Sequence, residues 1–130
     1  MKVTEYSGKS ENRILASMLT NKLVLGKIRE KWNSDGLFSS KWANTIAKWA
    51  IAYYDRHAEA PKRSINAIFS NWVDKHSESP ELEPMEMFMS ELSRVYSKEK
   101  LGTSYVLEMA ENVFSQNKME QHIRKAQGLS

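Results

Sequence analysis

The sequence of 130 residues contains no cysteine, three prolines and five glycines. Without cysteine the chain has no disulfide framework, no thiolate nucleophile and no cysteine-ligated zinc or iron–sulfur site. The absence also suits a reducing compartment, and we expect the protein to be cytoplasmic. No redox chemistry can therefore be read from the sequence, and thiol catalysis is excluded.

Long apolar runs are also missing. No stretch approaches the roughly 18–20 apolar residues that a membrane-spanning helix needs, and the polar N-terminus has no apolar segment typical of a signal peptide. The chain nevertheless has four tryptophans, five tyrosines, four phenylalanines and seven methionines, which is enough apolar material for a core. We predict one soluble domain, residues 1–130, with no membrane partner.

Catalytic and metal-binding signatures are absent as well. Residues 8–10, Gly-Lys-Ser, resemble the end of a phosphate-binding loop, but Val3 stands where the first glycine of that motif should be. The histidines have no partners at ligand spacing; they are His57, His76 and His122. We expect no active site, so the chain is not an enzyme by itself, and we expect no metal and no cofactor.

No segment alternates as a half-buried strand would, and every clear apolar pattern has the helical period. The sequence therefore predicts an all-α fold of about six helices. The expected helices are one at about 10–20 capped by Ser10, one ending at the turn 33–36, one ending before Pro61, one from Ser64 to about Lys75, one from Pro84, and one at about 104–126.

We divide the domain into a flexible N-terminus, residues 1–9, a globular helical head, residues 10–76, and a C-terminal antiparallel helical hairpin, residues 84–127. The interval 76–84 is the only stretch that resembles a linker, because it is rich in serine, proline and glutamate. About five residues join the fifth and sixth helices, and so short a connection favours an antiparallel pair.

The two halves of the expected last helix differ in their content of apolar residues. Its first half is rich in apolar residues, whereas its second half offers only Met119, Ile123 and Ala126 among charged residues. A 23-residue helix is roughly 35 Å long, which exceeds what so small a domain comfortably covers. We therefore expect copies of the chain to pair through the hairpin, with Phe114, Met119 and Ile123 near the contact.

Charge is unevenly distributed. Residues 1–75 carry 13 basic against 7 acidic residues, a net +6, while residues 76–130 carry 6 against 9, a net −3. A basic face over residues 22–63 could contact nucleic acid or another anion, and the candidate contacts are Lys22, Lys27, Arg29 and Lys31. Because these charges are dilute, we expect weak or no direct nucleic-acid binding.

Several segments resemble the N-terminal domain of DnaB-type replicative helicases, especially phage and prophage versions. Residues 11–19, which read ENRILASML, are similar to that domain's opening E-x-x-(I/V)-L-x-x-(L/M)-L helix. Further segments resemble stretches of that domain in their apolar positions and turns, at Leu25 to Ile28, Leu37-Phe38, Ala60-Pro61, Met85 to Tyr96 and the helix that opens at Tyr105. The similarity spans about residues 11–128, but the histidine that many members place after the aromatic near position 38 is missing.

The resemblance implies an oligomerisation collar that takes part in DNA replication, assembles as a dimer or a higher ring and receives a primase or a helicase loader. The ATPase domain of that family, with its Walker motifs, is absent from this chain. Two alternatives remain at this stage. One is a small helical nucleic-acid-binding module using residues 22–63, and the other is a phage inhibitor of a host protein.

Overall fold

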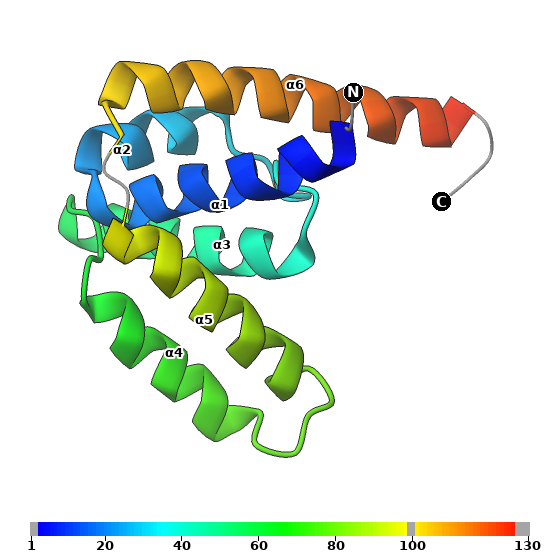
Figure 1. Ribbon diagram of the computed structural model, residues 1–130. Helices are drawn as coiled ribbons and strands as arrows, with labels where there is room; N and C mark the ends of the chain where they lie inside the picture. Colours follow the sequence, from blue (N-terminus) through cyan, green and yellow to red (C-terminus); the bar gives the residue numbers. More distant parts are fainter. Residues whose placement is uncertain (1–2, 99–100, 127–130) are drawn as a thin grey trace.

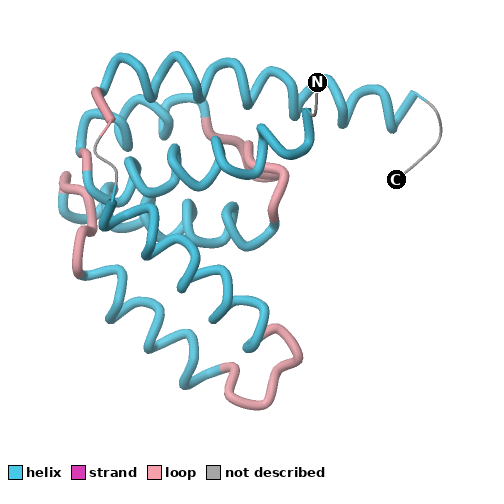
Figure 2. The backbone as a smooth tube through the Cα atoms, viewed as in Figure 1, coloured by secondary structure: helices cyan, strands magenta, loops and turns pink. Residues whose placement is uncertain are grey.

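The computed structural model describes residues 3–98 and 101–126, and in that part of the chain it contains six α-helices and no strand (Figures 1 and 2). The helices are α1 Val3–Thr20, α2 Lys22–Lys31, α3 Lys41–His57, α4 Ser64–Lys75, α5 Leu82–Lys98 and α6 Thr103–Ala126. The all-α fold with six helices is confirmed.

Helix α1 lies at the centre and packs against α2, α3, α5 and α6. Its inner face carries Ile14, Leu15, Met18 and Leu19, each at most 1% exposed. The spacing of these residues places them on one side of a helix, and α2, α3 and α6 cover that side (Figure 1). We call α1, α2, α3 and α6 the body.

Helix α1 begins at Val3, seven residues before the predicted start. Ser10 therefore lies inside the helix, where it is 2% exposed, and it does not act as the cap that the sequence suggested. Part of the N-terminus predicted to be flexible, residues 3–9, belongs to this helix, and residues 1–2 lie outside the described part.

The loop from 32 to 40 is held by a side chain of α3. Asn44 accepts a hydrogen bond from the backbone N–H of Phe38 and donates one to its carbonyl, both at 2.9 Å. Gly36 has φ +85°, and a Cβ atom there would lie 2.3 Å from the Asn44 side chain. Only glycine meets both conditions, so this residue fixes the turn that the sequence predicted.

The side chain of Glu11 connects this loop to α1 and α6. The side chain is buried, and its carboxylate accepts hydrogen bonds from the backbone N–H and hydroxyl of Ser39 and from Nδ2 of Asn117, at 2.8, 3.1 and 2.7 Å. Asn117 also donates to the carbonyl of Leu37. A buried carboxylate is tolerated only when such donors satisfy it, and these four residues join α1, α6 and the loop.

The fifth and sixth helices do not form the expected hairpin. Helix α6 packs along α1 and α2, whereas α5 packs on α1, and the two helices diverge in Figure 1. The expectation was wrong because a short connection allows antiparallel packing but does not require it, and both helices pack on α1 instead. Residues 99–100 of that connection, and residue 127 at the predicted end of the hairpin, lie outside the described part.

Helices α4 and α5 form an arm that leads away from the body (Figure 1). Only one residue of α4 is buried, Ile65, although the helix also carries Ile68, Phe69, Trp72 and Val73 on its apolar side. The rings of Phe69, Trp72 and His76 stack with interplanar angles of 13°. These ring contacts lie within α4 and its C-terminal end, and the contact between Trp49 and Trp72 attaches α4 to α3.

Candidate functional site

The predicted interface residues separate into one buried residue and two exposed ones. Phe114 is 7% exposed, and its ring packs edge-on against Phe38 with centroids 5.2 Å apart. It belongs to the core of this domain and is not accessible to a second copy, so its assignment to an interface is corrected. The physical reason is that α6 lies on α1 and α2 over the stretch that contains Phe114.

Met119 and Ile123 are exposed, at 64% and 46%. They are four residues apart in α6, so they share one face of the helix. Figure 1 shows the final turns of α6 extending beyond the other helices. The structure therefore places these two predicted residues on an uncovered part of the molecule.

The predicted basic residues all lie exposed on α2, but three of them face carboxylates. Arg29 donates from Nε to Oδ1 of Asp55, and this hydrogen bond together with the Asp55 charge raises the pKa of Arg29. The ammonium groups of Lys22 and Lys31 lie 4.0 Å from Glu59 and 3.6 Å from Glu111. Lys27 is the remaining member of the set. This pairing reduces the positive field of α2 and weakens the nucleic-acid alternative.

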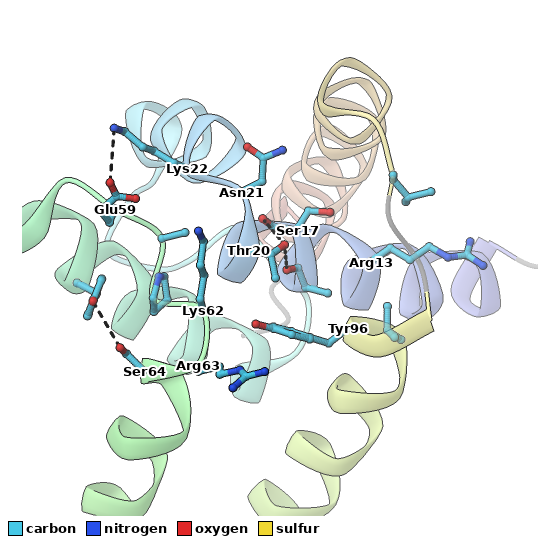
Figure 3. Close-up of a pocket in the computed structure, with 16 residues that line it drawn as sticks. Arg13, Ser17, Thr20, Asn21, Lys22, Glu59, Lys62, Arg63, Ser64 and Tyr96 are labelled. Carbon is cyan, nitrogen blue, oxygen red and sulfur yellow. Dashed lines mark hydrogen bonds and ion pairs between the residues drawn. The ribbon is translucent and has the colours of Figure 1, made fainter.

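A cavity of about 970 Å³ lies where α1, α4 and α5 approach the loop between α3 and α4 (Figure 3). Its polar lining is mainly cationic or hydroxylic: Arg13, Ser17, Thr20, Lys22, Lys62, Arg63, Ser64 and Tyr96. Among the lining residues that the structure describes, Glu59 is the only carboxylate, and it forms an ion pair with Lys22. This described lining therefore has an excess of positive charge.

The loop that carries two of these cations has an unusual backbone. Lys62 has φ +51°, in the left-handed region, and its backbone N–H donates to the carbonyl of Leu19 at 2.7 Å. Ala58 also has a positive φ, 57°, at the end of α3. The left-handed conformation costs a non-glycine residue about 1–2 kcal/mol, so the packing of this loop on α1 has to compensate for it.

Sequence reasoning missed both the cavity and the buried Glu11. A signal for Glu11 existed, because it lies three and four residues before Ile14 and Leu15 and thus on the apolar face of α1. Lys62 and Arg63 carried no such signal. They line one cavity with Ser17 and Tyr96 only because the fold brings distant segments to one place.

In residues 3–98 and 101–126 no group of three histidine, aspartate or glutamate side chains comes together in a way that could hold a metal ion. None of the helices in those ranges is both long and apolar enough to cross a membrane. Comparison of the chain with protein-family models, with curated proteins and with solved structures gives no match.

Proposed function

We propose that this chain is a non-catalytic assembly domain whose copies associate through the final turns of α6. The observation that carries the proposal is the exposure of Met119 and Ile123 on one face of a helix end that no other described part of the chain covers. Single exposed apolar residues are ordinary on protein surfaces, but an adjacent pair on a projecting helix offers a contact area that a second helix can match.

A two-fold contact suits this surface, because each copy would contribute the same stripe and each stripe would be the partner of the other. The stripe is only two residues wide among charged neighbours such as Lys118 and Glu120. An isolated pair of copies would therefore bind weakly. Further contacts in a larger assembly would strengthen the association by raising the effective concentration.

The resemblance to the N-terminal domain of DnaB-type helicases supports a role for such an assembly in DNA replication. In that role the domain would act as an oligomerisation collar, and a primase or a helicase loader would be its docking partner. This finer part of the proposal depends on the sequence pattern of residues 11–128. The α6 contact depends on the exposed residues alone.

The test is the double substitution Met119→Glu and Ile123→Glu, measured by sedimentation equilibrium over a range of protein concentrations. Both side chains are exposed, so the circular-dichroism signal of the helices should remain nearly unchanged. In a two-fold contact the introduced carboxylates would lose their water and face the same carboxylates of the second copy. The dimer dissociation constant should therefore rise at least tenfold.

Gln121→Glu is the matched control for Ile123→Glu, because both add one carboxylate to the final turns of α6 and residue 121 lies on a different face from 123. The control should leave the solution mass unchanged. The proposed α6 contact is wrong if wild type is monomeric at millimolar concentration. It is also wrong if the single variants Ile123→Glu and Gln121→Glu have the same dimer dissociation constant. Unfolding of the double variant would instead assign both residues to the core.

A further inference from the structure

The cavity between α1, α4 and α5 combines an apolar interior with a charged rim. Ala16 and Ala60 are 6% and 4% exposed, and Val95 and Tyr96 are partly buried, so the less exposed part of the lining includes these apolar and aromatic side chains. Its volume of about 970 Å³ is large enough to admit side chains from outside the domain. The cavity therefore offers apolar contacts to a group that enters it.

The basic groups of the lining stand apart from one another. Figure 3 shows the charged ends of Lys62 and Arg63 pointing away from each other, and Arg13 lies at the other end of the view from Lys62. Both Lys62 and Arg63 are exposed, and within residues 3–98 and 101–126 neither of them takes part in an ion pair. A partner that matches this rim carries several separated carboxylates, because one small anion reaches only one of these groups.

The outer face of α5 has the opposite charge and an apolar residue at its centre. Met87 is 67% exposed. Glu83 lies one turn before it and Glu91 one turn after it on the same side of the helix, and both carboxylates are exposed. Glu86 is exposed at the edge of this side, and Arg94 forms an ion pair with Glu91 at 3.7 Å. We call Glu83, Glu86, Met87 and Glu91 the acidic face.

The cavity and the acidic face are complementary. The described lining has four basic residues against one carboxylate, a net +3, and the acidic face together with Arg94 has three carboxylates against one cation, a net −2. Opposite charges of this kind attract and orient two surfaces. Methionine is long, unbranched and polarizable, so it fits an irregular apolar cavity and makes favourable contacts with an aromatic ring such as that of Tyr96. The partly buried position of Tyr96 favours a protein partner over a nucleic acid, whose bases stack on accessible rings.

We propose that the acidic face of one copy docks into the cavity of a second copy. Met87 enters the cavity and packs against Tyr96, and the carboxylates of Glu83 and Glu91 approach separate cations of the rim. The contact joins two different surfaces, so one copy of the pair keeps a free cavity and the other keeps a free acidic face, and further copies can add at either end. It uses no residue of α6 and therefore goes beyond the proposed function.

The experiment follows the amide signals of a ¹⁵N-labelled Met87→Ala chain, whose cavity is intact, while unlabelled wild type is added up to millimolar concentration. We expect saturable shifts at residues 16, 17, 20, 59–64, 95 and 96, which line the cavity. Shifts at residues 115–123 would report the α6 contact instead. The two contacts are thus read separately in one spectrum.

Met87→Ala in the unlabelled partner tests the apolar part of the contact. Leu23→Ala is the matched control, because Leu23 is also 67% exposed and lies outside the cavity lining. Both substitutions remove apolar surface from exposed sites, so neither should disturb the fold. The Met87→Ala partner should bind the labelled chain at least fivefold more weakly than wild type, and the Leu23→Ala partner should bind within twofold of it.

Glu83→Gln with Glu91→Gln in the partner tests the charged part. We expect at least threefold weaker binding at low ionic strength, and the difference should shrink as salt is added, because salt screens exposed charges. Glu30→Gln with Glu108→Gln removes two exposed carboxylates elsewhere and is the matched control. This control pair should change the affinity less than twofold.

Absence of shifts at the cavity residues with millimolar wild type would overturn the proposal. So would equal affinities of the Met87→Ala and Leu23→Ala partners, because the association would then not depend on Met87. Equal losses in the two glutamine pairs would show general charge attraction with no defined contact. An unlabelled single-stranded oligonucleotide that displaces the partner at a lower concentration would assign the cavity to nucleic acid. None of these results bears on the α6 contact, which is measured on the variants of Met119 and Ile123.

Discussion

The body and the arm are built from helices of comparable pattern, but they differ in how deeply their apolar faces are buried. Helices α4 and α5 separate apolar from polar residues at least as clearly as α1 does. Yet α1 buries a continuous stripe, whereas α4 buries only Ile65, and α5 buries Met85 and Leu92. Amphipathicity tells which face of a helix turns inward, and the number of neighbouring helices decides how far that face is buried.

The largest expected effect comes from a matched pair of isoleucines. Ile46 on α3 is fully buried in the body, and Ile68 on α4 is only partly buried in the arm. Ile46→Ala should lower the free energy of unfolding by about 3–4 kcal/mol, through lost transfer energy and a new cavity. Ile68→Ala should cost about 1 kcal/mol, because solvent already reaches the side chain. Urea denaturation of both variants measures the difference, and equal losses would remove the contrast between body and arm.

A pair of glutamates tests the same contrast with polar groups. Glu11→Ala leaves the N–H and hydroxyl of Ser39 and the amide of Asn117 without their buried acceptor. We expect a loss of about 2–3 kcal/mol in the free energy of unfolding. Glu91→Ala, on the exposed surface of α5, should change it by less than about 0.5 kcal/mol. A Glu11→Ala variant as stable as wild type would show that water replaces the carboxylate.

The smallest expected effect concerns an ion pair between α3 and the segment that enters the arm. Lys41 donates to Glu81 at 2.7 Å, and this hydrogen bond together with the lysine charge lowers the pKa of Glu81. Because the folded-state pKa lies below the unfolded value, the stabilising contribution is present above the unfolded pKa. It is lost as the pH falls through the folded pKa.

Comparison of wild type with Glu81→Gln across acidic pH measures this contribution. The gap in melting temperature should be small near neutral pH, because both side chains are well exposed, and it should close as the pH falls below the ordinary range of a glutamate. Lys41→Met should remove the same pH dependence. A gap that widens on acidification would mean that Glu81 does not act through Lys41.

Several features of the fold could be read from the residues themselves. The stripe Ile14, Leu15, Met18 and Leu19 identified the inner face of α1, and Asn33 to Gly36 identified the turn before α3. The sparse apolar stripe after Phe114 indicated that the end of α6 would lack cover, and Met119 and Ile123 are indeed exposed. In each case the signal is local, because it depends on residues within one or two turns of the chain.

Other features could not be read in this way. The start of α1 at Val3 was missed because Ser10 is a common helix cap, and the local pattern contained no sign that it would be buried. The packing of α6 on α1 and α2 was missed because a short connection between α5 and α6 is compatible with several arrangements. The cavity around Lys62 was missed because its walls come from segments far apart in the sequence.

By itself the sequence determined the helical class, the number of helices and the faces that they bury, because these depend on period, caps and turn residues. The tertiary structure alone decided that α1 is the centre, that Phe114 belongs to the core and that Lys62 and Arg63 share a cavity with Tyr96. The physical reason is that side-chain periodicity acts over a few residues. Which apolar faces meet depends instead on competition among all the helices for the same buried area.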